Sequence, residues 1–181
     1  MQQTLLALLA LIITVFLSYN QERSMIHAKG AMIDAEMEVM ASGVALQVLE
    51  FIGHGAFDEQ TTDDAKVTLT SELTSAGSFG ASGRCDVSAP IETTYPYTVC
   101  DDIDDFHQMV MEHVPFVLQS DTVFFDVTAE VQYVDANGDA ATGATFNKKV
   151  VVTVQHAGLK QYLKTPVLLS RTFSYERMRR S

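Results

Sequence analysis

The feature that most constrains this chain is an apolar run close to its N-terminus. The run spans Leu5–Leu17 and reads LLALLALIITVFL, with Thr14 as its only polar residue, and no charged residue precedes Glu22. A helix over this run is about 20 Å long, whereas the hydrocarbon core of a bilayer is about 30 Å thick. With the flanking residues 1–4 and 18–19 the helix comes close to a full span, so we expect the segment to be able to enter a membrane.

A cleaved secretory signal is one alternative for this run. The first three residues carry no positive side chain, and no small-x-small cleavage site follows Leu17, so we expect the segment to be retained. The nearest positive charges, Arg23 and Lys29, follow the run. A plain membrane anchor with this charge distribution would place the wrong end in the cytoplasm under the positive-inside rule.

The helical pattern continues far beyond the apolar run, and no proline occurs before Pro90. Apolar or small residues recur at steps of three and four from Ile26 to Phe51, and charged residues occupy the opposite face, which is typical of an amphipathic helix. The sequence at 53–55, Gly-His-Gly, favours a helix end there. We predict one helix over about residues 3–52, roughly 75 Å long. Its second part is expected to pack on a domain through Ile33, Met37, Met40, Val44, Val48 and Phe51.

The first part of this helix has no cover within its own molecule. A small domain is about 30 Å across, so about twenty N-terminal residues project beyond it with apolar side chains on all sides. Each exposed Leu or Ile forgoes about 1.5–3 kcal/mol of burial free energy. Lipid, or the same segment of neighbouring copies, is therefore expected to cover Leu5, Leu6, Leu8, Leu9, Leu11, Ile12, Ile13, Val15 and Phe16.

After the helix the sequence changes to a pattern of β-strands, and we divide the chain into residues 1–24, 25–56 and 57–181. Alternating apolar residues and the turn sequence Asp135–Gly138 predict an antiparallel sheet. One apolar face of this sheet needs a covering helix, which the amphipathic part supplies. The expected fold class is therefore α+β, a long N-terminal helix on a small antiparallel sheet. The predicted strands are 66–73, 122–134, 144–156 and 166–175.

Composition limits the classes of binding partner and the cellular compartment that we expect for this chain. Twelve basic and 23 acidic residues give a net charge of −11, which repels phosphate and argues against nucleic acid as a general partner. The two cysteines, Cys85 and Cys100, are too few for a four-cysteine zinc site but suffice for one disulfide, the expected state outside the cytoplasm. Closing such a loop contributes about 3 kcal/mol. Two buried free thiols are the alternative.

Signals of catalysis and of metal binding are weak. The sequence contains no H-E-x-x-H, G-x-S-x-G or G-x-G-x-x-G motif, so we expect neither an enzyme nor a cofactor or metal site. Asp135, Asn137 and Asp139 have the oxygen spacing of a calcium loop but lack its closing glutamate, so a hairpin turn is favoured over a calcium site. For the cluster Asp101–Asp105 we expect capping of a helix that begins before Phe106.

This layout resembles the type IV pilin and pseudopilin superfamily. The shared features are the apolar run, the uninterrupted amphipathic helix through Ile52, the small antiparallel sheet over residues 122–175 and the cysteine pair in the later half of the chain. The family usually shows a leader that ends in glycine, followed by an early glutamate. Leu5 and Leu6 stand where that glutamate is expected.

The resemblance implies a structural subunit of an extracellular, type IV pilus-like helical filament. The apolar side chains named above would then pack in the filament core. The chain would form a homo-oligomer, assembled by pilus machinery from a precursor inserted in the inner membrane. Two alternatives stay open: a minor pseudopilin or tip component of a secretion or pilus system, and a signal-anchored periplasmic binding domain.

Overall fold

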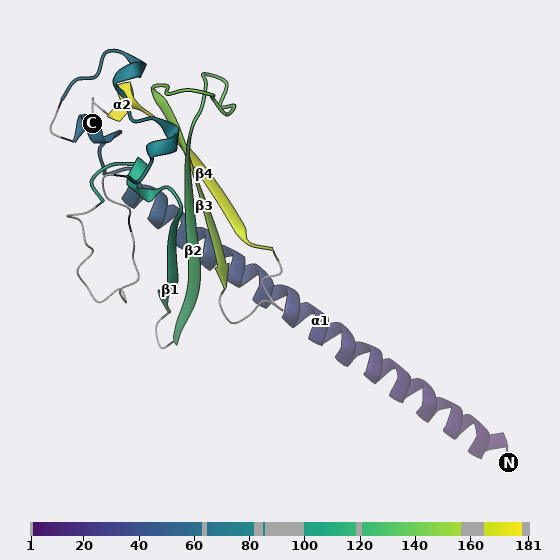
Figure 1. The fold of residues 1–181 in the computed structure, drawn as a ribbon. Coiled ribbons are helices and arrows are strands. Elements are labelled where there is room, and N and C mark those ends of the chain that lie inside the picture. The colour runs from purple at the N-terminus through teal and green to yellow at the C-terminus, as the bar shows by residue number, and fades with distance from the viewer. Residues whose placement is uncertain are drawn as a thin grey trace.

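The protein has an α+β architecture, as predicted. A computed structural model describes residues 2–62, 65–81, 85, 100–118, 121–156 and 165–178. The helix α1, Gln2–Ile52, lies on a four-stranded antiparallel sheet (Figure 1). The strands lie in the order of the chain, and they are β1 (Met109–Leu118), β2 (Asp121–Tyr133), β3 (Asn147–His156) and β4 (Val167–Ser174). A short helix, α2, follows as Tyr175–Met178.

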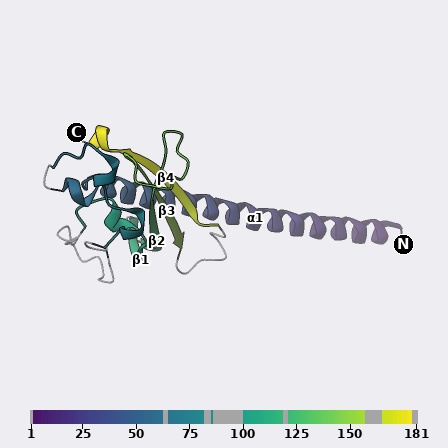
Figure 2. The same ribbon diagram turned by 45° about the horizontal axis from the view of Figure 1, so that its top comes forward.

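α1 is one unbroken helix and reaches far beyond the sheet. Its 51 residues correspond to about 76 Å at 1.5 Å per residue. Figures 1 and 2 show its C-terminal part against the sheet, while its N-terminal part extends alone away from the head, by which we mean the chain after Ile52. The helix ends as predicted, and the N–H of Gly53 still donates to the carbonyl of Leu49. A Cβ atom on Gly53 would lie 2.9 Å from the Phe173 ring, so a larger residue there would force this ring to shift.

Contact between α1 and the head begins at Met37, and the helix packs mainly on β3 and β4. Five of the six predicted packing residues are buried or half-buried in this interface: Met37, Met40, Val44, Val48 and Phe51. The prediction that Ile33 packs on the head is wrong, because its side chain is 42% exposed. The apolar stripe of the helix continues toward the N-terminus, but the described part of the head does not bury it there. Ala41 and Ala45 are fully buried, and their small side chains allow α1 to approach the sheet closely.

β2 and β3 form the centre of the sheet and supply much of the core. Their register pairs Val127 with Val154 and Val131 with Val150, so alternate residues of both strands are buried. The opposite residues of β2 face outward and are more exposed. The predicted strands 122–134, 144–156 and 166–175 are confirmed, with ends that shift by up to three residues.

Two segments differ from the prediction. Residues 66–73 do not form a strand, because Oε2 of Glu72 accepts the N–H groups of Thr68 and Leu69 and closes a 3-10 turn, Thr70–Glu72. Strand β1, in contrast, was not predicted. It contains Pro115 and a bulge, with a φ of 61° at His113, and such features are tolerated because β1 lies at the edge of the sheet.

The predicted hairpin between β2 and β3 is confirmed. Oδ1 of Asp135 accepts the N–H of Asn137 at 2.8 Å and that of Asp139 at 3.0 Å. Gly138 has a φ of 89°, a conformation that glycine adopts without strain. The carboxylate that had suggested calcium therefore closes the turn through backbone hydrogen bonds.

The helix–sheet interface predicts a large difference between two leucines of α1. Leu49 is 3% exposed and Leu46 is 57% exposed. We expect Leu49→Ala to lower the free energy of unfolding by about 2–5 kcal/mol through loss of burial and a residual cavity. Leu46→Ala is the matched control and should change it by less than about 0.5 kcal/mol. Urea unfolding of the full chain in mild detergent measures both. Equal effects of the two substitutions would contradict this helix orientation.

Candidate functional site

The apolar segment of α1 is not buried by the described part of the head. Its predicted packing residues, from Leu5 to Phe16, have exposed fractions of 50–70%. The described part of the chain contains one helix that is long and apolar enough to cross a membrane, and the most apolar stretch of this helix is entirely unburied. A signal sequence can be equally long and apolar. This finding therefore establishes an uncovered apolar surface but does not identify what covers it.

A second set of exposed apolar residues lies on the other part of α1. Met25, Met32, Val39 and Leu46 are spaced by seven residues, and their exposed fractions are 57–72%. Side chains seven residues apart lie close to one face of a helix. The last two lie in the part of α1 that packs on the head, so they mark its outward face. The predicted stripe from Ile26 to Phe51 is a different face, the one directed at the sheet.

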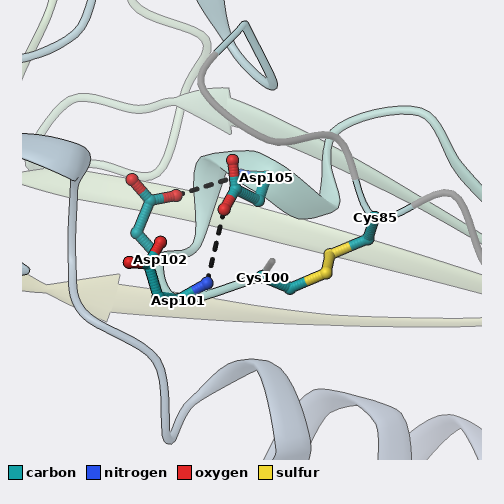
Figure 3. Close-up of a disulfide and its surroundings, with 5 residues drawn as sticks. All are labelled: Cys85, Cys100, Asp101, Asp102 and Asp105. Carbon is teal, nitrogen blue, oxygen red and sulfur yellow. Dashed lines mark hydrogen bonds between the residues drawn. A yellow bond between two sulfur atoms is a disulfide. The ribbon is translucent and has the colours of Figure 1, made fainter. Parts of the chain in front are cut away.

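The predicted disulfide joins Cys85 to Cys100, with 5.6 Å between their Cα atoms (Figure 3). The N–H of Cys85 also donates to the carbonyl of Asp105 at 3.2 Å. The bond therefore fixes residue 85 beside the acidic segment that follows Cys100. Figure 3 shows that Asp102 and Asp105 lie next to this bond and contact one another through a hydrogen bond.

A buried charge cluster lies at the junction of α1 and the sheet. The side chain of Lys148 is 0% exposed, and its Nζ donates to three oxygen atoms. These are the carbonyl of Phe57 at 2.7 Å, Oδ2 of Asp58 at 2.8 Å and Oδ1 of Asp104 at 2.5 Å. All three ammonium hydrogens therefore have acceptors within the protein.

Aromatic rings surround this ammonium group. Nζ of Lys148 lies 4.8 Å from the ring centre of Phe57, 5.2 Å from that of Phe79 and 5.4 Å from that of Tyr133. Rings at these distances attract a cation through their negative faces, and they also occupy the space where water would otherwise solvate it. The cluster is thus a charged group enclosed by apolar surface.

Three distant parts of the chain bring this cluster together. Asp58 follows the end of α1, and Asp104 begins the one-turn 3-10 helix Asp104–Phe106 that precedes β1. Lys148 lies in β3, opposite Tyr133 of β2. Backbone hydrogen bonds between Ala56 and the segment 101–103 hold the first two parts side by side.

Asp58 is well supplied with hydrogen-bond donors. Its carboxylate accepts the N–H of Thr74 at 3.1 Å, the hydroxyl of Thr74 at 2.9 Å and the hydroxyl of Tyr133 at 3.1 Å. Burial acts to raise its pKa, but the charge of Lys148 and these hydrogen bonds outweigh burial and hold the pKa below its usual value. Asp58 is therefore the ionised partner of the lysine.

The neighbouring aspartates behave differently. Burial raises the pKa of Asp102 to about 8, and the charges of Asp104 and Asp105 act in the same direction. Burial also raises the pKa of Asp104, against the opposing effect of Lys148, and raises that of Asp105 to about 6. Oδ2 of Asp102 and Oδ2 of Asp104 are buried and accept no N–H or hydroxyl group of the described residues. Protonation, which the raised pKa values of both groups favour, lessens this deficit.

The sequence prediction for the acidic segment is confirmed in part. One 3-10 turn, Asp104–Phe106, forms before Met109, and Oδ1 of Asp102 accepts the N–H of Asp105 within it at 3.0 Å. Three of the carboxyl groups of this segment are also buried, which was not predicted. The burial of Lys148 was not predicted either, although its position alternates in register with Val150, Val152 and Val154, which are all buried.

Comparison of the chain with protein-family models, with curated proteins and with solved structures finds no match. Among the described residues, no group of three or more His, Cys, Asp or Glu side chains is arranged to hold a metal ion.

Removing the buried cation predicts a large loss of stability. Lys148→Met leaves Asp58 and Asp104 buried without their positive partner, and breaking a buried ion pair in this way costs about 3–5 kcal/mol. Lys149→Met, at the next position of β3, removes a charge that is not fully buried and should cost less than about 1 kcal/mol. Chemical unfolding of the full chain in detergent compares the two variants, and a loss below about 1 kcal/mol for Lys148→Met would refute the cluster's structural role.

The raised pKa values predict how stability depends on pH. The pKa values of Asp102 and Asp105 are about 8 and about 6 in the folded protein, against about 3.9 for an unfolded aspartate. The folded state therefore retains protons that the unfolded state releases, and stability falls as pH rises from about 4 to about 8. The lowered pKa of Asp58 acts oppositely, and its contribution is lost below about pH 4.

The measurement is the melting temperature of the full chain in detergent from about pH 4 to about pH 8. Asp102→Asn retains an uncharged side chain and should flatten the upper part of the decline. Asp121→Asn, at an exposed position of β2, should leave the decline unchanged. A melting temperature that rises steadily over this range would contradict the assignment of a protonated Asp102.

Proposed function

We propose that this chain is a structural subunit of an extracellular, pilin-like helical filament, assembled by bundling of the N-terminal halves of α1. The observation that carries the proposal is the uncovered length of this helix. Its first 36 residues lie outside the helix–sheet interface, which begins at Met37. The long helix, the small antiparallel sheet and the disulfide are compatible with the type IV pilin superfamily.

The energetic argument favours identical partners. Each Leu, Ile, Val or Phe of the run Leu5–Leu17 gains about 1.5–3 kcal/mol when it is transferred from water to an apolar environment. Copies of the same helix supply such an environment in a dry bundle. The uncovered segment and the head lie at opposite ends of the molecule, so copies that bundle their segments with a stagger along the fibre keep their heads outside the bundle (Figure 1). Such head-to-tail contacts do not close and generate a helical fibre.

The outward face of α1 supports a helix as the neighbour. Met25, Met32, Val39 and Leu46 repeat every seven residues, and a seven-residue apolar repeat is the spacing by which helices pack along one another. Counting back by sevens gives Ser18 and Leu11, which connects this face with the apolar run. A single neighbouring helix is thus able to pack along both the apolar N-terminal part of α1 and the part that packs on the head.

The same segment supports a membrane-inserted stage before assembly. α1 is long and apolar enough to span a bilayer. A subunit can therefore be inserted in the inner membrane until assembly machinery extracts it. The disulfide agrees with a head outside the cytoplasm, where such bonds persist. Lipid covers the apolar side chains at the first stage, and neighbouring copies cover them at the second.

A charge in the proposed filament core tests this function. We expect Leu9→Asp to abolish fibres in sheared surface fractions viewed by negative-stain electron microscopy, because the filament core offers the carboxylate no water. Leu69→Asp introduces the same charge at a head residue of similar exposure, 60% against 52%, and should leave fibres intact. Fibres that survive Leu9→Asp would contradict helix bundling. Absence of fibres from the unaltered chain would contradict the role of a main subunit and favour a low-copy component.

A further inference from the structure

The buried charge cluster is not explained by filament assembly, because it lies inside the head and none of its members is accessible to a neighbour. Lys148, Asp58, Asp102 and Asp104 have exposed fractions of 0–1%. The cluster also contains more carboxyl groups than one ammonium group needs. Burying each charged group costs several kcal/mol, and a stable core would be built at lower cost from apolar residues. The arrangement therefore calls for a chemical role.

We propose that Lys148 and Asp104 become joined by an isopeptide bond, which the folded head forms without any other reactant. Nζ of Lys148 lies 2.5 Å from Oδ1 of Asp104, so the carboxyl carbon of Asp104 is one bond beyond an atom already in contact with the nucleophile. Two groups held at this separation react with effective molarities of about 10⁵–10⁸ M when they are correctly aligned. The bond would link β3 to the segment before β1.

The reaction balances with the groups present. The ammonium of Lys148 and the carboxylate of Asp104 become an amide and one molecule of water, and nothing is oxidised or reduced. Asp58, 2.8 Å from Nζ, accepts a proton and leaves a neutral amine. The amine nitrogen attacks the carboxyl carbon of Asp104, and the bond from that carbon to Oδ2 breaks.

Asp102 supplies the proton that the leaving oxygen needs. It lies two residues before Asp104, both side chains are buried, and its raised pKa keeps it protonated at neutral pH. Oδ2 of Asp104 accepts no other donor of the described residues, so it is the oxygen that takes protons and departs as water. The second proton of this water comes from Nζ. Asp58 keeps the proton that it accepted and Asp102 ends as a carboxylate, so the number of protons on the carboxyl groups is unchanged.

Asp104, and not Asp58, is the acyl partner. Asp58 accepts the N–H and hydroxyl of Thr74 and the hydroxyl of Tyr133, so its oxygen atoms keep donors after Nζ has become part of an amide. Oδ2 of Asp104 accepts no N–H or hydroxyl group of the described residues, and burial favours the uncharged form of Asp104. A protonated carboxyl group is the better acceptor of a nucleophile, because the oxygen that leaves does so as water.

The surroundings favour the product. The rings of Phe57, Phe79 and Tyr133 enclose Nζ, and they exclude the water that would otherwise reverse the reaction. Formation of the amide replaces a buried ammonium and a buried carboxylate with one neutral group. Both the departure of water from this enclosed space and the removal of two buried charges drive the reaction toward the amide.

Intact mass spectrometry of the full chain, purified in detergent and then denatured, tests the proposal. The expected mass is lower than that of the sequence by one water, in addition to the two hydrogens lost in the disulfide. Reduction of the disulfide should restore only those hydrogens. Proteolysis and tandem mass spectrometry should then yield a branched peptide that joins Asp104 to Lys148. A mass that shows the disulfide alone would overturn the proposal, and a branch at Asp58 would overturn the assignment of the acyl partner.

Variants separate the roles within the cluster. Lys148→Met and Asp104→Ala should abolish the loss of water, whereas Lys149→Met, the matched control on the same strand, should retain it. Asp102→Asn removes the general acid, a group that accelerates such reactions by about 10²–10⁴-fold, so the cross-linked fraction of freshly made protein should fall sharply. An unchanged cross-linked fraction in Asp102→Asn would contradict the role of Asp102. The mass of the unaltered chain shows by itself whether the bond exists. The proposal can therefore be refuted even if a variant folds poorly.

Discussion

The length of α1 relative to the sheet governs the rest of this structure. The helix is about 76 Å long, and the head covers it only from Met37 onward. A chain that exposes Leu5–Leu17 to water carries a free-energy deficit of many kcal/mol relative to one in which that run is buried. The fold of the described residues therefore leaves a large apolar surface without cover.

The head, in contrast, is completed by its own residues. Phe57 and Asp58 follow α1 directly, and Lys148 binds both of them together with Asp104. This contact joins the end of the helix, the segment before β1 and the middle of the sheet at one point. The disulfide lies beside the same segment, so an ion-pair cluster and a covalent bond both hold the region where α1 enters the head. A helix that projects freely needs such an anchor, because any force on it acts at this junction.

Much of this fold is predictable from the sequence, since it depends on periodicity. The bounds of α1, the strands β2, β3 and β4, and the Asp135 hairpin follow from local patterns that tertiary contacts reinforce. The extent of helix–sheet contact does not follow from such patterns. The apolar stripe has the same sequence spacing at Ile33 whether or not a sheet packs against it. Strand β1 escapes prediction because Pro115 and the bulge interrupt its alternation. The cluster escapes it because Asp58, Asp104 and Lys148 are distant in the chain, and only the inward register of Lys148 hints at their meeting.

The ionisable residues that are buried in this core are also the residues that are placed to react. A lysine in the core-facing register of β3 and an aspartate that holds its proton at neutral pH both reduce the stability of the head while they remain charged or chargeable. Sequences that keep such groups in a core usually do so for a site. Here the same burial that raises the pKa of Asp102 makes it a proton donor at neutral pH, beside a carboxyl group that already contacts an amine. The cost in stability and the capacity for reaction therefore have one physical origin, the exclusion of water from this junction.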